Sequence, residues 1–300
     1  MFRNCGGSQQ SPVDIDTEDA LKSAFLKPLE FHGYDRPLRN AVILNNGHTV
    51  LIKAERNSDP PFIKGGGLDG KYTFRQLHFH WGSSNDKGSE HRIDGKSYPG
   101  EVEFLQTLAR IFQFGSCHSN PPTLGVLVAL RPVSLHRASK INILLHSLHI
   151  VHEKNGETGD LAVVAVFLEI SKRKNLDLEP IITSLPKVSV PGPVVPIKKS
   201  FQLAKMLPKD AKHYYRYVGS LTTPPCTEGV TWTILATPVR IGEHQLKAFR
   251  RLRASSGSKH FLSDNFRLPQ ELHQRIILES IIPKARGVSD KQKSTTSSQM

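Results

Sequence analysis

The feature that most constrains the fold of this chain is a series of short segments rich in β-branched and aromatic residues. Turn-forming sequences such as Asn45-Asn46-Gly47 and Gly65-Gly66-Gly67 separate them. Short runs of this composition, bounded by glycine and asparagine, are typical of strands rather than helices. We therefore expect strands at residues 42–44, 48–53, 72–81, 148–152, 161–170 and 230–235.

Helical patterns are few. Leu178, Ile181, Ile182 and Leu185 fall at helical spacing, and residues 242–253 are amphipathic. With 300 residues, of which 38% are hydrophobic, the chain is long enough to bury a large core. The sequence predicts a mainly β fold with peripheral α-helices.

The charge of the chain limits its partners. Its formal net charge is +13, from 40 lysine and arginine residues against 27 aspartate and glutamate residues. This charge is spread along the chain without a nucleic-acid-binding signature, so we expect no nucleic-acid partner. No apolar run approaches the roughly 20 residues of a membrane span, and the N-terminus lacks the pattern of a secretory signal. We expect a monomer without a membrane span.

The strongest local motif is residues 76–82, Gln-Leu-His-Phe-His-Trp-Gly. On a strand, Gln76, His78 and His80 face one side, and the apolar residues between them face the other. Two imidazoles about 7 Å apart along a strand are spaced to share one metal ion. The alternative is a pair of half-exposed histidines on a polar face.

A catalytic zinc ion needs three protein ligands and one open position for water. In the predicted strand 148–152, His149 can supply the third imidazole, and Val151 lies on the same face. The alternative for His149 is a structural histidine in the core. Three neutral nitrogen ligands leave the zinc ion its full charge, which lowers the pKa of a bound water to about 7. Such a site suits a hydratase or a hydrolase.

Six motifs along the chain occur in a fixed order. They are residues 10–15, 45–48, 79–82, 88–91, 159–169 and 219–225. In this order they resemble the alpha carbonic anhydrase family, from Gln10 to about Leu268. The resemblance implies one domain, residues 5–283, built on a large, twisted, mostly antiparallel sheet. It also implies reversible hydration of carbon dioxide.

The resemblance assigns roles to the metal site. It implies that His78, His80 and His149 bind Zn²⁺ and that Gln76 orients the ring of His78. Partners of this kind fix the tautomer of a ligating imidazole. It also implies that His48 is the proton shuttle, since each turnover must export a proton and an imidazole with a pKa of about 6.5 can carry it.

The resemblance also implies how the substrate is held. Thr222 matches the threonine that accepts a hydrogen bond from the attacking oxygen, and Glu90 matches the carboxylate that accepts the threonine's own proton. Thr223 matches a substrate-contacting position beside them. The remaining substrate-binding positions form an apolar wall, which consists of Val151, Val163, Leu221, Val230 and Trp232.

The chain departs from the family pattern before the third histidine. Residues 102–147 separate Glu101 from the strand of His149, and we interpret them as an insertion. Where the family has a glutamate two positions before this histidine, the chain has Ser147. A register without a break would place Glu103 at the ligand position instead. We favour His149, because the family pattern continues directly after it, and keep Glu103 as the alternative.

The two ends of the chain bear on its location. The aromatic segment that precedes Gln10 in the family is missing, and residues 284–300 have the polar composition of a disordered tail. Cys5 and Cys226 occupy the positions at which secreted and membrane-attached family members form a disulfide. Such bonds persist in oxidising compartments. We expect a secreted protein, with a cytoplasmic one as the alternative.

The predicted function is therefore the zinc-dependent, reversible hydration of carbon dioxide to bicarbonate and a proton, a lyase reaction. Two alternatives stay open. One is a zinc-free or catalytically impaired protein that keeps the family fold as a binding module. The other is a zinc esterase, for which the same metal site would suffice. The third zinc ligand separates the first alternative from an active enzyme.

Overall fold

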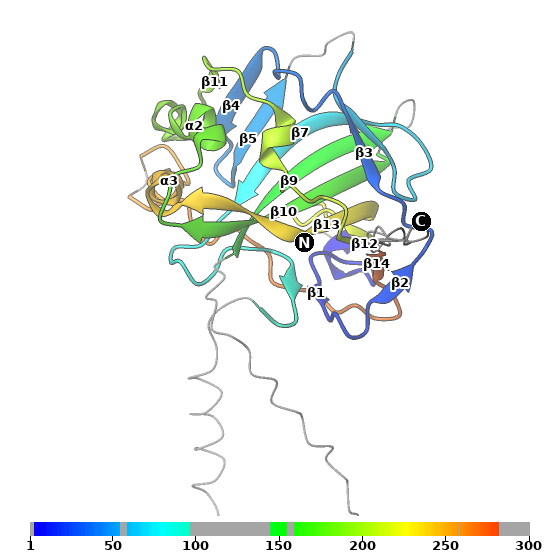
Figure 1. Ribbon diagram of the computed structural model, residues 1–300. Coiled ribbons are helices and arrows are strands. Elements are labelled where there is room, and N and C mark those ends of the chain that lie inside the picture. The colour runs from blue at the N-terminus through cyan, green and yellow to red at the C-terminus, as the bar shows by residue number, and fades with distance from the viewer. Residues whose placement is uncertain (1–2, 55–58, 97–144, 155–158, 258, 282–300) are drawn as a thin grey trace, which may run out of the picture.

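The computed structural model describes residues 3–54, 59–96, 145–154, 159–257 and 259–281 (Figure 1). Glu103, most of the predicted insertion and the predicted tail lie outside these residues. The described chain is mainly β, which confirms the predicted fold class. Its strands are β1 (Asp14–Ile15), β2 (Leu21–Ser23), β3 (Leu29–His32), β4 (Ala41–Asn45), β5 (Val50–Ala54), β6 (Phe62–Gly65), β7 (Tyr72–His80), β8 (Arg92–Ile93), β9 (Leu145–Lys154), β10 (Leu161–Ser171), β11 (Val194–Pro196), β12 (Tyr214–Ser220), β13 (Glu228–Gly242) and β14 (Leu278–Ser280).

The helices are short and lie outside the sheet (Figure 1). They are the α-helices α2 (Glu179–Ile182) and α3 (Glu243–Phe249) and the 3-10 helices η1 (Arg3–Gly6), η2 (Leu176–Leu178), η3 (Leu185–Val188) and η4 (Leu203–Met206). None of the helices in the described ranges is long and apolar enough to cross a membrane.

One twisted sheet of 12 strands forms the body of the molecule (Figure 1). Its main path runs β11-β4-β5-β7-β9-β10-β13-β12-β14-β2, and β3 and β6 join it beside β7. The pairs β10–β13 and β14–β2 are parallel, and the other pairs of this sheet are antiparallel. The predicted large, mostly antiparallel sheet is confirmed.

Alternate residues of the central strands enter two different apolar clusters. In β9, Leu148 and Ile150 belong to the larger cluster, whereas Val151 belongs to the smaller one. In β10, Val164 lies in the larger cluster and Val163 in the smaller one. This two-residue period places the odd-numbered residues of β9 on the same face of the sheet as Gln76, His78 and His80 of β7, which follow a register shift after Phe74.

Some predicted boundaries were wrong. Strand β5 begins at Val50 rather than at residue 48, because the Asn46 side chain accepts hydrogen bonds from the backbone N–H groups of His48 (3.0 Å) and Thr49 (2.8 Å) and forms a turn there. Strand β9 begins already at Leu145, so the last residues of the predicted insertion belong to the sheet.

The predicted helices are also shorter than expected. The helix expected at residues 242–253 is confined to α3, because β13 continues as far as Gly242. The helical pattern at 178–185 forms three short segments instead of one helix. Pro186, at the start of the last segment, has no N–H group to continue a helical hydrogen-bond ladder.

Candidate metal centre and active site

Three predicted metal ligands meet on neighbouring strands. His78 of β7 stands directly opposite His149 of β9, and His80 lies two residues further along β7. One ligand atom from each of the three residues lies within 4.8 Å of the others. The ring centroids are 5.0 Å apart for His78 and His80, 5.2 Å for His78 and His149, and 4.6 Å for His80 and His149. The sheet register thus brings together the residues that the sequence separates.

The chemistry of this cluster fits a metal ion. Nε2 of His80 and both ring nitrogens of His149 are buried and have no hydrogen-bond partner among the described residues. Buried polar atoms are rarely left unpaired in folded proteins. Burial, and to a smaller extent the charge of His80, lowers the pKa of His78 and of His149 well below the ordinary value. These imidazoles are therefore neutral at neutral pH, the form that binds metal.

Two oxygen atoms orient the histidines of β7. Nδ1 of His78 lies 2.9 Å from Oε1 of Gln76, the contact that the sequence predicted. Nδ1 of His80 lies 2.7 Å from the backbone oxygen of Asn265. Each ring donates its Nδ1 hydrogen to the oxygen, and this tautomer leaves Nε2 free to bind a metal ion. Sequence reasoning missed Asn265, because it is 185 residues from His80 and carries no local signature.

Glu90 faces the cluster from the side. Its Oε1 lies 3.4 Å from Nδ1 of His80 and accepts a hydrogen bond of 2.9 Å from the backbone N–H of Arg267. Its Oε2 lies 3.7 Å from Nδ1 of His149 and has no hydrogen-bond partner among the described residues. The predicted hydrogen bond from the Thr222 hydroxyl to this oxygen is therefore not formed in the structure. The hydroxyl group of Ser147, buried on β9, also has no hydrogen-bond partner within the described ranges.

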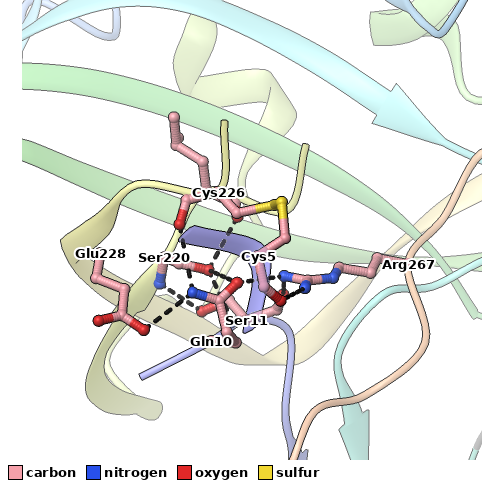
Figure 2. The surroundings of a disulfide bond; sticks show 8 residues. Cys5, Gln10, Ser11, Ser220, Cys226, Glu228 and Arg267 are labelled. Carbon is pink, nitrogen blue, oxygen red and sulfur yellow. Dashed lines mark hydrogen bonds between the residues drawn. A yellow bond between two sulfur atoms is a disulfide. The ribbon is translucent and has the colours of Figure 1, made fainter. Parts of the chain in front are cut away.

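A disulfide holds the loop that carries Thr222 and Thr223. Cys226, at the end of this loop, is bonded to Cys5, as the resemblance implied, and its N–H donates to the backbone oxygen of Thr223 at 3.0 Å. Figure 2 shows Gln10 beside the bond, donating to the backbone oxygen of Cys226 at 3.3 Å. In the loop, Thr222 is half-buried and Thr223 is exposed.

Arg267 fastens the N-terminal segment on the other side of the disulfide (Figure 2). Its guanidinium group donates to the backbone oxygens of Cys5 at 3.0 Å and Ser11 at 2.8 Å, and to Oε1 of Gln10 at 2.9 Å. Because its own N–H bonds Glu90, this residue joins the disulfide region to the metal cluster. No local pattern in the sequence indicated this link.

The predicted apolar wall forms one continuous surface. Its buried members Val151, Val163, Val230 and Trp232 belong to the smaller apolar cluster, and Leu221 packs against them. The indole ring of Trp232 lies 5.0 Å from the ring of His149, centroid to centroid. An uncharged substrate beside this wall would therefore lie close to the metal cluster.

His48 lies apart from the three clustered histidines. It occupies the turn between β4 and β5, and its side chain is exposed. Its backbone oxygen accepts a hydrogen bond of 2.9 Å from the side-chain amide of Asn265. Its location at the surface suits exchange of a proton with solvent.

Two further histidines are buried nearby without a predicted role. Nε2 of His91 bonds the hydroxyl group of Tyr217 at 2.7 Å, and burial, with a smaller effect of His80, lowers the pKa of His91 to about 3. His146 lies on β9 beside Phe79, Trp81, Leu168 and Phe249, and its two ring nitrogens have no hydrogen-bond partner in the part of the chain that the structure describes. His91 falls in a family motif, whereas nothing in the sequence drew attention to His146.

The fold and the site together define the class of protein: it has a large twisted sheet on which a three-histidine cluster, with His80 and His149 buried, lies beside an apolar wall. A family model described as eukaryotic-type carbonic anhydrase matches residues 1–159 and 148–281. The chain belongs to this family, and the predicted resemblance is confirmed.

Individual family members match over most of their length. The chain is 33% identical over 276 residues to putative carbonic anhydrase 3 of Caenorhabditis elegans, covering 92% of this chain and 91% of that protein. It is 33% identical over 277 residues to carbonic anhydrase 7 of Homo sapiens, covering 91% and 89%. Identity to the mitochondrial carbonic anhydrase 5B of Homo sapiens is 34% over 277 residues, covering 92% and 74%.

Proposed function

We propose that this protein is a zinc-dependent carbonic anhydrase, which catalyses the reversible hydration of carbon dioxide to bicarbonate and a proton. The observation that carries the proposal is the convergence of His78, His80 and His149, in which Nε2 of His80 and both ring nitrogens of His149 are buried and lack a hydrogen-bond partner among the described residues. Three imidazoles in such a cluster would hold a zinc ion and leave one position open. When bound, the ion would lower the pKa of a water ligand to about 7 and so supply the nucleophile.

The residues around the cluster would orient the attack. Thr222 would accept a hydrogen bond from the attacking oxygen and donate a hydrogen bond from its own hydroxyl group to Glu90. The unpaired Oε2 of Glu90 is the acceptor available for this bond. A donor and an acceptor fixed in this order would aim a lone pair of the nucleophile at the substrate carbon.

Carbon dioxide would bind to an apolar surface, and the proton would leave through a polar, exposed side chain. Carbon dioxide carries no net charge, so we assign it to the apolar wall, where Trp232 contacts His149, and we assign Thr223 as an exposed residue that contacts it. His48, exposed in its turn, would take the proton released in each turnover and pass it to buffer. These assignments rest on the family resemblance and on the placement of each side chain.

The disulfide indicates the compartment in which the protein is located. Because a Cys5–Cys226 bond persists in an oxidising compartment, we propose a secreted protein. We further propose a monomer whose partners are carbon dioxide and bicarbonate. We also propose that residues 5–283 form one domain, that residues 102–147 are an insertion in it, and that residues 284–300 are a disordered tail.

A second candidate function is a zinc-free binding protein. The serine at position 147 favours this second function. A serine there cannot supply the carboxylate partner of His149, and Nε2 of the His149 ring has no hydrogen-bond partner among the described residues. Loss of such a partner typically weakens metal binding by about 10–100-fold. An active enzyme and a zinc-free protein differ in their zinc content.

The test is the zinc content and carbon dioxide hydration rate of the purified full chain and of single variants. We expect His78→Ala, His80→Ala and His149→Ala to lose both, because two imidazoles cannot complete the site. The matched control is His146→Ala, a buried histidine on the opposite face of β9, which should retain zinc. Stoichiometric zinc in His149→Ala, together with its loss in Glu103→Ala, would show that the third ligand is Glu103.

A further inference from the structure

Asn265 touches both the metal cluster and the turn that carries His48. Its backbone oxygen accepts the hydrogen bond from His80 described above. Its Oδ1 accepts a hydrogen bond of 2.8 Å from the backbone N–H of Trp81, the residue after β7. Its Nδ2 donates to the backbone oxygens of His48 at 2.9 Å and Phe79 at 3.3 Å. One carboxamide therefore ties the His48 turn to the strand of the metal ligands.

The rest of the turn is held by its own residues and by the side-chain amide of Asn45, which donates to the backbone oxygen of Arg253 at 3.0 Å. Oδ1 of Asn45 accepts a hydrogen bond of 2.8 Å from the N–H of Gly47, and Asn46 accepts those of His48 and Thr49. These bonds shape the turn without attaching it to β7. The attachments to β7 are Asn265 and the hydroxyl group of Thr49, which donates to the backbone oxygen of Phe79 at 2.5 Å.

We propose that Asn265 is a positioning residue for proton transfer, which holds His48 at a set distance from the metal cluster. This inference rests on the proposed function, in which His48 exports the proton. The side chain of His48 is exposed, so its location depends on the backbone of the turn rather than on packing. Proton transfer to a side chain requires a fixed separation, direct or through water, and a displaced carrier transfers more slowly.

Two substitutions separate the functions of the carboxamide. Asn265→Asp keeps an acceptor for the N–H of Trp81 but places a carboxylate oxygen against the backbone oxygens of His48 and Phe79. Asn265→Ala removes the acceptor and the donor together. Both keep the backbone oxygen that bonds His80.

The neighbouring residue offers a matched control. Asp264 accepts hydrogen bonds from the N–H (2.8 Å) and the hydroxyl group (2.9 Å) of Ser83 and from Lys87 (3.0 Å), none of which involves the His48 turn. Its φ angle of 54° suits glycine, so Asp264→Gly loosens the same segment without backbone strain. A general loosening would therefore affect the control as well.

The kinetic readout is the split between kcat in weak buffer and kcat/KM. Proton export follows the attack on carbon dioxide, so it affects kcat and not kcat/KM. We expect both Asn265 variants to lower kcat in weak buffer about threefold to tenfold, the range for one lost hydrogen bond. Added imidazole should restore the rate. In a His48→Ala background, Asn265→Ala should cause no further loss, because it acts through His48.

The second readout is independent of activity. Amide hydrogen exchange of residues 46–49 should accelerate in both Asn265 variants and stay unchanged in Asp264→Gly, with zinc content unaltered in all. Unchanged exchange in the turn, or a loss of kcat/KM and zinc instead of kcat, would overturn the positioning role. If the unsubstituted chain lacks zinc and activity, the proposed function fails, and the exchange measurement decides by itself whether Asn265 holds His48.

Discussion

Deleting residues 102–147 is the perturbation that most directly tests the metal site. The deletion joins Glu101 directly to Leu148 of β9. Counted back along the strand, Glu101 then takes the position of Ser147, and Gly100 takes that of His146. Both replaced residues carry buried side-chain atoms without partners among the described residues.

The gain in stability follows from His146. This residue is 1% exposed, and burial, followed by the charge of Arg250, lowers its pKa to about 3. It also packs tightly, since a Cβ atom added to Gly88 would lie 2.1 Å from its Nδ1. Each buried, unpaired polar group costs about 1–3 kcal/mol. Removing the imidazole relieves this cost, and the packing lost with the ring is subtracted from it. We therefore expect the deletion to raise the free energy of unfolding by less than about 3 kcal/mol.

The gain in metal affinity follows from Ser147. A carboxylate at this position lies on the same face of β9 as His149 and can accept a hydrogen bond from its unpaired Nε2. Partners of this kind change metal affinity by about 10–100-fold. We therefore expect tighter zinc binding by this factor, with higher solubility and faster carbon dioxide hydration.

The assay is zinc affinity by competition with a chelator, together with denaturant unfolding of the zinc-free forms. Two substitutions in the full chain serve as controls: Ser147→Glu should reproduce the gain in affinity, and His146→Ala the gain in stability. Zinc binding weaker than that of the full chain would refute the register of β9 and the role of His149. It would point to Glu103, which the deletion removes.

The remaining predictions concern stability and proton transfer. Cys226→Ser opens a disulfide between residues 221 apart in sequence and should cost about 2–5 kcal/mol in unfolding free energy, measured against urea; a smaller loss would mean that Arg267 and Gln10 hold the loop unaided. Burial lowers the pKa of His91 to about 3 and of His152 to about 4, so the unfolded chain, with histidine pKa values of about 6.5, binds protons first. The zinc-free protein should therefore be most stable above pH 6.5 and lose stability as pH falls towards 4, and a flat profile would contradict this. His48→Ala should slow hydration in weak buffer and recover with imidazole; an unchanged rate in weak buffer would exclude His48 as the shuttle.

Several features of the site could be predicted from local pattern. The two-residue period of a strand sets which side chains share a face, so Gln76, His78 and His80 could be placed together from their spacing alone. The same period placed His149 and Val151 on one face of β9. Short apolar segments between turns predicted the β fold, and the order of motifs predicted the family.

Other features depend on contacts between distant segments. His80 meets Asn265 across 185 residues, Glu90 meets Arg267 across 177, and Cys5 meets Cys226 across 221. A local pattern cannot indicate these partners, because the register of a large sheet and the path of its loops follow from the packing of the whole core. The resemblance supplied the cysteine pair, but Asn265 and Arg267 carried no signal of their own.

The strand boundaries show the same division. The strand predicted at 148–152 begins at Leu145, because pairing with β10, where Leu145 stands opposite Glu169, extends it. Conversely, residues 48 and 49 suit a strand by composition. The Asn46 side chain, however, accepts hydrogen bonds from their N–H groups, and this keeps His48 in an exposed turn. The sequence pattern thus determined which side chains lie on each face of a strand. Tertiary packing decided which groups meet, because hydrogen bonds and burial are satisfied over the whole molecule at once.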